Sequence, residues 1–412
     1  MVPKGWTLLQ VSDICKLQNG NSFKPHEWDT QGLPIIRIQN LNGSDNYNYF
    51  SGVPQDKWLV EPGQLLFSWA GTKGVSFGPF IWNGPKGVLN QHIYKVFANE
   101  NVHGHWLYLA LLHITQKIEA QAHGFKSTLL HVQKKDIDNQ FVLTPPVAEQ
   151  KKIAQILSTW DKAISVTEKF LANSQQQKKA LMQQLLTGKK RLLDDNGTRF
   201  SEIWGLYALS KLFQRVTTKN NGKSTNVVTI SGQHGLIKQE DFFKKTVASD
   251  TLDGYFLLKK GQFAYNKSYS NGYPMGAIKR LNRYPEGVVT TLYICFELST
   301  PKESFGDYWE HYFESGLLNN SLSQIAHEGG RAHGLLNVKP SDFFSLKVPV
   351  PGFEEQQKIA AVLSAADAEI STLEKKLACL KDEKKALMQQ LLTGKRRVSV
   401  PVKVEEKESV SA

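Results

Sequence analysis

The sequence KKALMQQLLTGK occurs twice, at Lys178–Lys189 and again at Lys384–Lys395. The copies lie 206 residues apart, and the match extends backwards at the same offset, where EQKKIAQILS aligns with EQQKIAAVLS. Between residues 149–191 and 355–397, 27 of 43 positions are identical. A repeat of this length indicates a tandem duplication, so the two halves of the chain are expected to share one fold.

The similarity continues upstream of the repeated blocks, but it weakens. STLLHVQKKDI (127–137) parallels HGLLNVKPSDF (333–343) at the same offset, and WTLLQVSDI (6–14) parallels WGLYALSKL (204–212) at an offset of 198. Each half therefore consists of a divergent block followed by a nearly invariant one.

The invariant blocks predict two long helices, at residues 146–190 and 351–396. Apolar residues recur at alternating intervals of four and three, and neither Gly nor Pro interrupts the pattern. A 40-residue helix spans roughly 60 Å at 1.5 Å per residue. One apolar stripe is half of an interface, so the simplest structure packs the two helices together. The predicted core positions are Ile153, Leu157, Trp160, Ile164, Leu171, Leu181, Leu185, Ile359, Leu363, Ile370, Leu377, Leu387 and Leu391.

The direction of the helix pair follows from the duplication. If a pseudo-two-fold axis relates the halves, the helices run antiparallel and each end of the pair carries one domain. A parallel pair, with both domains at one end, is the alternative. The pseudo-two-fold arrangement is the simpler one, so we expect an antiparallel coiled coil.

The divergent blocks, residues 1–145 and 191–350, have an α+β pattern. Short β-branched and aromatic runs alternate with Gly- and Asn-rich turns, and one helix is expected at 106–121 and another at 308–326. The segment 397–412 is predicted to be a disordered tail. The expected fold class is α+β, with two homologous domains in tandem joined by two long conserved helices.

The composition excludes several classes of protein. Of 412 residues, 41% are apolar and 21% are charged, which is a globular balance, and three cysteines are too few for a disulfide framework. No apolar run reaches the roughly 18 residues of a membrane span, and no signal peptide is recognised, so we expect a cytoplasmic protein. The net charge of +12 favours a polyanionic partner. Most of the excess lies on the predicted helices, where a solvated coiled-coil face is an equally good explanation.

Catalytic patterns are missing from the sequence. NNGKST at Asn220 lacks the first glycine of a phosphate-binding loop, and TPPV at Thr144 lacks two features of an amino-methyltransferase tetrapeptide. His103 and His105 could ligate a metal, but no Cys or carboxylate cluster accompanies them. We therefore predict no catalytic and no metal-binding residues. Two divergent domains on a rigid spacer suit two different half-sites on a long ligand such as DNA.

The doubled pattern EQxxIAxxLSxxDxxI followed by KKALMQQLLTGKxR resembles the specificity subunits of type I restriction-modification systems, HsdS. The resemblance covers the chain to about Val398. It implies that each divergent block is a DNA target-recognition domain for one half of a bipartite, asymmetric site. It also implies that the helices set the spacing and dock two modification (methyltransferase) subunits, which restriction subunits with endonuclease and translocase activity join.

The resemblance further implies a non-catalytic subunit of a host-defence and DNA-modification complex, without a cofactor of its own. S-adenosylmethionine, ATP and Mg²⁺ are expected on the partner subunits. The second domain departs from the first where LNQH (89–92) is replaced by VTTL (289–292), so base contacts of Gln91 or His92 are not carried over.

Candidate DNA contacts follow from side-chain chemistry, because Arg and Lys suit guanine and phosphate, and Asn and Gln suit adenine. In the first domain they are Asn19, Asn21, Ser22, Lys24, Arg37, Gln39, Asn40, Trp69, Thr72, Lys73, Asn90, Gln91 and Lys126. In the second domain they are Lys219, Asn221, Lys223, Ser231, Gln233, His234, Asn266, Lys267, Tyr269, Asn271, Thr290, Thr291 and Arg331. The residues predicted for partner docking are Gln183, Gln184, Lys189 and Lys395.

Two hypotheses from other classes compete with DNA recognition. A self-contained modification and restriction enzyme would need methyltransferase and nuclease motifs, which were not found. A coiled-coil scaffold whose two domains bind proteins instead of DNA is the alternative. The divergence of the domains beside near-identical helices argues against the scaffold without excluding it.

Overall fold

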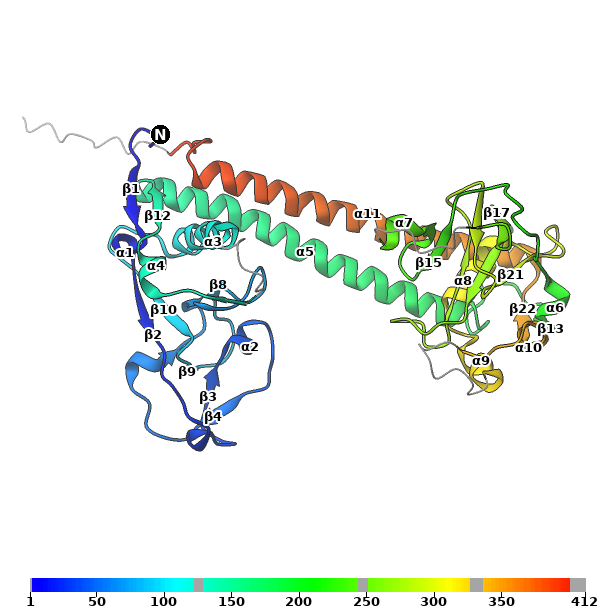
Figure 1. Cartoon of the computed structure of the whole chain (residues 1–412), viewed down its shortest axis with the longest axis horizontal. Helices are drawn as coiled ribbons and strands as arrows, with labels where there is room; N and C mark the ends of the chain where they lie inside the picture. Colours follow the sequence, from blue (N-terminus) through cyan, green and yellow to red (C-terminus); the bar gives the residue numbers. More distant parts are fainter. Residues whose placement is uncertain (1, 122–128, 244–250, 327–335, 401–412) are drawn as a thin grey trace, which may run out of the picture. The chain divides into compact units, whose positions relative to one another are not determined.

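The computed structural model describes residues 2–121, 129–243, 251–326 and 336–400 (Figure 1). The chain divides into two compact units, of which the first holds residues 1–167 and 376–412 and the second residues 168–375. Each unit thus contains one divergent block and parts of both repeated segments. The predicted domain limits follow the sequence blocks, whereas the units cut across both long helices.

The two repeated segments form helix α5 (Val147–Leu185) and helix α11 (Phe353–Leu392). Each helix is followed by a glycine in the left-handed region, with φ +69° at Gly188 and φ +67° at Gly394. Glycine adopts this conformation without a Cβ clash, so it ends the helix at that point. The predicted ranges 146–190 and 351–396 included these caps. Among the described residues, no helix combines the length and the apolar character needed to cross a bilayer.

Ion pairs between the repeated segments define the direction of the helices. They are Asp161–Lys384 and Glu149–Arg397 in the first unit, and Lys178–Asp367 and Arg191–Glu355 in the second. In each unit the residue numbers rise on one segment as they fall on the other, which is the signature of an antiparallel pair. Within the first unit, the start of α5 lies beside the end of α11 (Figure 1).

The apolar stripe of the long helices faces inward in both units. Every predicted core position is buried or half-buried. Ile153 and Leu157 belong to the hydrophobic core of the first unit, and Leu185, Ile359 and Leu363 to that of the second. Burial of this stripe supplies most of the stability of such helices.

The first domain contains two four-stranded sheets and two short ribbons among the described residues. The sheet orders are β2-β10-β6-β8 and β4-β3-β9-β5, and the ribbons are β1-β12 and β11-β7. The strands are β1 (Thr7–Gln10), β2 (Cys15–Asn19), β3 (Leu33–Ile36), β4 (Asn48–Phe50), β5 (Leu59–Val60), β6 (Leu65–Ser68), β7 (Ala70–Thr72), β8 (Gly78–Ile81), β9 (Gly87–Leu89), β10 (Ile93–Ala98), β11 (Leu129–His131) and β12 (Phe141–Thr144). The helices are α1 (Val11–Ile14), α2 (Ile38–Leu41), α3 (Gly104–Gln121) and α4 (Lys134–Asp138).

The second domain repeats this topology. Its four-stranded sheet β14-β21-β18-β19 has the order of β2-β10-β6-β8, and its pairs β15-β16 and β17-β20 correspond to β3-β4 and β5-β9. The strands are β13 (Gly205–Ala208), β14 (Phe213–Arg215), β15 (Val228–Ser231), β16 (Gly235–Lys238), β17 (Phe256–Lys259), β18 (Phe263–Asn266), β19 (Ala277–Arg280), β20 (Glu286–Val289), β21 (Ile294–Leu298) and β22 (Lys347–Val350). The helices are α6 (Leu209–Leu212), α7 (Gln239–Phe243), α8 (Gly306–Glu314), α9 (Asn319–Ile325) and α10 (Pro340–Ser345).

One predicted helix is wrong as a single element. The stretch 308–326 forms two helices, α8 and α9, whereas its counterpart in the first domain is the continuous helix α3. Gly316 interrupts the second-domain helix with φ +74°, and the Ser315 hydroxyl donates to the carbonyl of Tyr312 at 2.6 Å. A left-handed residue cannot continue a right-handed helix, so the chain turns there.

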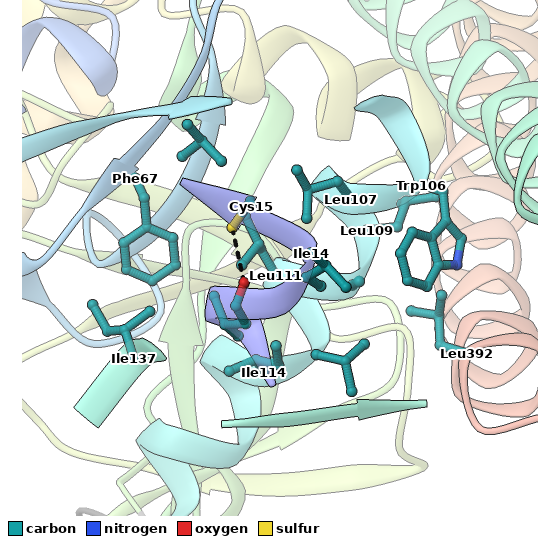
Figure 2. Packing of buried hydrophobic residues seen from close by; sticks show 14 of the residues in the cluster. Ile14, Cys15, Phe67, Trp106, Leu107, Leu109, Leu111, Ile114, Ile137 and Leu392 are labelled. Atoms are coloured by element: carbon teal, nitrogen blue, oxygen red, sulfur yellow. Dashed lines mark hydrogen bonds between the residues drawn. The ribbon is translucent and has the colours of Figure 1, made fainter. Parts of the chain in front are cut away.

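Each domain has a core that also includes the long helices. Figure 2 shows part of the first core, where Leu392 of α11 lies beside Trp106 of α3. The second core is rich in aromatic rings: Phe213 lies with its ring centroid 5.2 Å from those of both Trp309 and Phe296. These shared cores fix the domain and the helix pair of each unit into one body.

The three cysteines are expected to differ in reactivity. Cys15 and Cys295 are buried, and burial raises the pKa of each thiol to about 12, whereas Cys379 is exposed on α11. Because the thiolate is the reactive form, a thiol reagent at pH 8 should label only Cys379 in the folded protein and all three cysteines in urea. A count of labelled thiols by mass spectrometry checks this, and rapid native labelling of Cys15 or Cys295 would contradict it.

Candidate DNA interface

In the first domain, several strands end at one edge of the sheets. β3 and β9 run in parallel with Ile36 opposite Leu89, so the next residues, Arg37 and Asn90, emerge together. The backbone of Asn21 joins them, because its N–H donates to the carbonyl of Leu89 at 2.8 Å. This edge therefore gathers three of the predicted DNA contacts from segments far apart in the sequence.

The same edge has a tight backbone approach at Gly20. A Cβ at this position would lie 2.2 Å from the carbonyl oxygen of Asn90, which is far inside contact distance. Only glycine fits there, so the segment Gly20–Asn21 can lie directly on the turn between β9 and β10.

Trp69 follows β6 and packs on that turn. Its Nε1–H donates to the carbonyl of Gln91 at 3.1 Å, and its ring centroid lies 5.0 Å from that of His92 and 4.6 Å from that of His131. Burial, and then the neighbouring His131, lower the pKa of His92. His92 is therefore neutral at pH 7, and this part of the edge offers hydrogen-bonding and stacking groups instead of a cation.

Arg37 is held in a fixed direction by its neighbours. Its guanidinium donates to the side-chain oxygens of Asn48 at 2.7 Å and Gln39 at 3.1 Å, and it lies 5.2 Å from the ring centroid of Trp28. Asn40 has a different role, because its buried amide donates to two backbone carbonyls of the turn that follows α2. In this conformation Arg37 is oriented at the edge, whereas the Asn40 side chain stabilises the turn.

The second domain has a corresponding edge at the ends of β15, β18 and β20. β15 ends at Ser231 and β18 at Asn266, and Thr290 begins the turn that leads from β20 into β21. Lys219 belongs to this edge through its bridge to Phe256, which lies opposite the end of β20. The two domains thus present different side chains from equivalent strand ends.

A pair of neighbouring cations lies at the second edge. Burial lowers the pKa of Lys267, and the nearby guanidinium of Arg215 lowers it further. The Lys267 ammonium donates to the carbonyl of Val338 at 3.4 Å. A lysine whose charge is destabilised by burial and by a neighbouring guanidinium is suited to an anion such as a phosphate.

Two loops extend the second edge. Gln233 and His234 are exposed in the turn between β15 and β16, and the carbonyl of Gly232 in that turn accepts from the hydroxyl of Tyr273 at 3.0 Å. The exposed residues Tyr269 and Asn271 lie in the loop between β18 and β19. The hydroxyl bond therefore ties one loop to the other.

Other predicted contacts lie elsewhere or are engaged in structure. Lys73 donates to the carbonyl of Glu119 at 2.6 Å near the end of α3, and Ser231 is buried and accepts from the backbone of His234. Lys126 and Arg331 lie outside the described residues. The remaining predicted contacts are exposed or half-buried: Asn19, Ser22, Lys24, Gln39, Thr72, Asn221, Lys223 and Thr291.

Three residues at the edges escaped the sequence reasoning. Trp28 is 38% exposed beside Arg37, His131 packs on Trp69, and Arg215 lies beside Lys267. His131 lies in STLLHV, which parallels HGLLNV in the second half of the chain, and this parallel was a usable signal. Trp28 and Arg215 had no pattern around them that could have marked them.

The invariant polar residues at the helix starts hold each domain on the helix pair. Gln150 accepts from the backbone N–H of His103 at 2.8 Å, and Gln356 accepts from that of Phe305 at 2.9 Å. The residues predicted for partner docking, by contrast, are exposed: Gln183, Gln184, Lys189 and Lys395. The tail predicted as disordered begins at Arg397, which binds Glu149, and its residues 401–412 lie outside the described part of the chain.

Comparisons with known proteins agree with this organisation. The sequence profile of the type I restriction modification DNA specificity domain matches residues 3–173 and again residues 210–381. The putative type I restriction enzyme MjaX specificity subunit of Methanocaldococcus jannaschii is 24% identical over 433 aligned residues, which cover 96% of this chain and 95% of the relative. The type I restriction enzyme EcoBI specificity subunit of Escherichia coli is 28% identical over 158 residues, which cover 37% of this chain and 32% of the relative.

Solved structures share the fold. The S subunit of a type I restriction-modification system from M. genitalium has a TM-score of 0.55 at 15% identity, covering 95% of this chain and 96% of that one. A chain from a study of complex assembly and conformational transition of the type I R-M system has a TM-score of 0.56 at 14% identity, covering 96% and 100%. The predicted fold class is confirmed. Because the profile matches both halves and most of the residues, the protein belongs to the type I restriction modification DNA specificity domain family.

Proposed function

We propose that this chain is the DNA sequence-recognition subunit of a type I restriction-modification complex. Each domain reads one half of a bipartite, asymmetric site, and the coiled coil sets the distance between the halves. The observation that carries the proposal is the pair of equivalent edges. Both domains expose strand ends of the same topology, but Arg37, Trp69 and Asn90 occupy one edge, whereas Asn266, Lys267 and Thr290 occupy the other.

The proposal includes partners and cofactors. The chain acts without catalytic residues of its own, as members of the specificity-subunit family do. Two modification subunits dock on exposed residues of the repeated segments, which are Gln183, Gln184 and Lys189 in the first and Lys395 in the second, and restriction subunits join that assembly. S-adenosylmethionine, ATP and Mg²⁺ belong to these partners, which perform adenine methylation and ATP-dependent cleavage.

Methylome sequencing tests the proposed function. DNA is compared from cells that carry this chain with its modification subunit and from cells that carry the modification subunit alone. A bipartite motif with methyladenine in both halves, present only with this chain, is the expected result. If the modification subunit is active but no methylation depends on this chain, the result would favour the alternative, a scaffold whose domains bind proteins.

Replacement of Lys267 by alanine should weaken DNA binding by the assembled complex nearly equally for all sequences. A lost phosphate contact reduces the slope of log K against log salt by about one. The measurement is a DNA-binding titration at several salt concentrations. The matched control is Lys260→Ala, which removes an exposed lysine from the turn between β17 and β18, at the opposite edge of the domain. An equal loss with Lys260→Ala would show a non-specific charge effect.

A further inference from the structure

A polar node joins the first domain to both long helices. His105 of α3 makes a hydrogen bond through Nε2 to the hydroxyl of Ser158 on α5, at 3.0 Å. One helical turn further along α5, Asp161 forms an ion pair with Lys384 of α11. Asp161 and Lys384 both act electrostatically on the ring of His105. Four residues from three helices of the first unit thus form one connected group.

The second unit contains an equivalent node, in which α11 supplies the serine and the aspartate and α5 supplies the lysine. His311 of α8 bonds through Nε2 to the hydroxyl of Ser364 on α11 at 3.0 Å, and its Nδ1 lies 3.7 Å from Asp367. Asp367 forms an ion pair with Lys178 of α5. Histidine, serine and aspartate are each displaced by 206 residues from their first-unit equivalents.

The lysine, in contrast, always comes from the other repeat. Lys384 serves the first node and Lys178 serves the second, although these lysines are equivalent residues of the two copies. One structural role is therefore shared by the serine and aspartate of the motif LSxxD and the first lysine of KKAL. They connect a domain helix to both members of the helix pair.

The nodes restrict the orientation of each domain on the helix pair more than they stabilise the fold. The ion pair of the first node is only partly buried, with the side chains of Lys384 19% and Asp161 45% exposed, and such pairs stabilise a protein only weakly. The cores already hold each domain by hydrophobic contact, which has no preferred direction. Hydrogen bonds weaken steeply when they are misaligned, so the node restricts how α3 or α8 is oriented on the helix pair.

We propose that the two nodes are positioning sites that determine the permitted spacing between the DNA half-sites. This inference rests on the proposed function. A domain that is free to tilt on its helices accepts half-sites that are one base pair closer or further apart. A domain that is fixed by its node accepts one spacing. The residues assigned to this role are His105, Ser158, Asp161 and Lys384 in the first node, and His311, Ser364, Asp367 and Lys178 in the second.

The test is a methylation assay with the assembled modification complex. The DNA substrates keep both half-sites constant and change the non-specific spacer by −1, 0 or +1 base pair. The variant Ser158→Ala/Lys384→Met removes two contacts of the first node. We expect its preference for the correct spacer to fall roughly three- to tenfold, as the loss of about one net hydrogen bond would cause. Its discrimination against a wrong base within a half-site should remain unchanged.

A matched control removes a contact between the same helices without a domain residue. The Ser174 hydroxyl donates to Glu369 at 3.1 Å, so Ser174→Ala/Glu369→Gln should keep the wild-type spacer preference. The charge exchange Asp161→Lys/Lys384→Asp should restore much of the preference that Lys384→Met alone removes.

Three results would overturn the inference. The first is an unchanged spacer preference in the node variant. The second is a parallel loss of base discrimination, which would indicate general damage to the domain. The third is an equal effect of the Ser174→Ala/Glu369→Gln control. Failure of the proposed function can be distinguished from failure of this inference. In that case the wild-type complex would methylate none of the substrates, whatever their spacer.

Discussion

Replacement of Arg191 by alanine should lower the free energy of unfolding of the second unit by about 3–5 kcal/mol, as expected for removal of one partner of a buried ion pair. The Arg191 guanidinium donates to both carboxylate oxygens of Glu355, at 2.6 and 2.7 Å. The side chain of Glu355 is only 2% exposed, and its remaining donor is the indole N–H of Trp204 at 2.9 Å. The variant therefore leaves a buried carboxylate without its cation. Urea unfolding followed by circular dichroism measures the change.

The duplication supplies the control for this prediction. Arg397 makes the same two-pronged contact with Glu149 in the first unit, but its side chain is 41% exposed. Because water replaces part of the lost interaction there, Arg397→Ala should destabilise its unit less. The double variant Arg191→Ala/Glu355→Gln should recover much of the loss, since no buried charge is left. Equal effects of Arg191→Ala and Arg397→Ala would contradict the assigned role of burial.

Replacement of Trp309 by alanine should destabilise the second unit by roughly 3–5 kcal/mol, the usual result of emptying a core position of this size. Trp309 is fully buried in α8 and packs against the aromatic rings of Phe213, Tyr312 and Phe313. No neighbouring side chain can fill that volume without leaving its own contacts. The midpoint of urea unfolding and the near-ultraviolet circular dichroism of the aromatic cluster report the loss.

The milder variant Trp309→Phe separates packing from hydrogen bonding. The indole N–H donates to the hydroxyl of Ser304 at 2.6 Å, and Ser304 is itself buried. Phenylalanine keeps much of the ring contact but leaves this hydroxyl without its donor, which costs on the order of 1–3 kcal/mol. The additional change Ser304→Ala should recover part of that cost. A Trp309→Phe variant as unstable as Trp309→Ala would contradict the prediction.

The long helices were predictable because their signal is local and repeated. A stripe such as Ile153, Leu157, Trp160 and Ile164 reflects the geometry of one helix, and the second copy repeats it. The break at Gly316 was not predictable, since an isolated glycine within a helical pattern is often tolerated. Its effect depends on how Ser315 closes the end of α8.

The candidate interface was only partly predictable, because it is built from contacts between distant segments. Asn21, Arg37 and Asn90 were chosen for their side-chain chemistry, but their common position follows from the parallel pairing of β3 and β9. The buried amide of Asn40 satisfies neighbouring carbonyls, which composition alone could not reveal. The positions of the predicted contacts at the strand ends are structural facts, whereas their contact with DNA remains a prediction.

The exchange of lysines between the nodes has an evolutionary consequence. Each repeated segment carries the serine and aspartate for the domain that precedes it, together with a lysine and an arginine that serve the other domain. Substitutions in one copy can therefore weaken the attachment of either domain, depending on which residue changes. A different domain could attach to the same helix pair, provided that it presents a histidine and a loop amide at the joints.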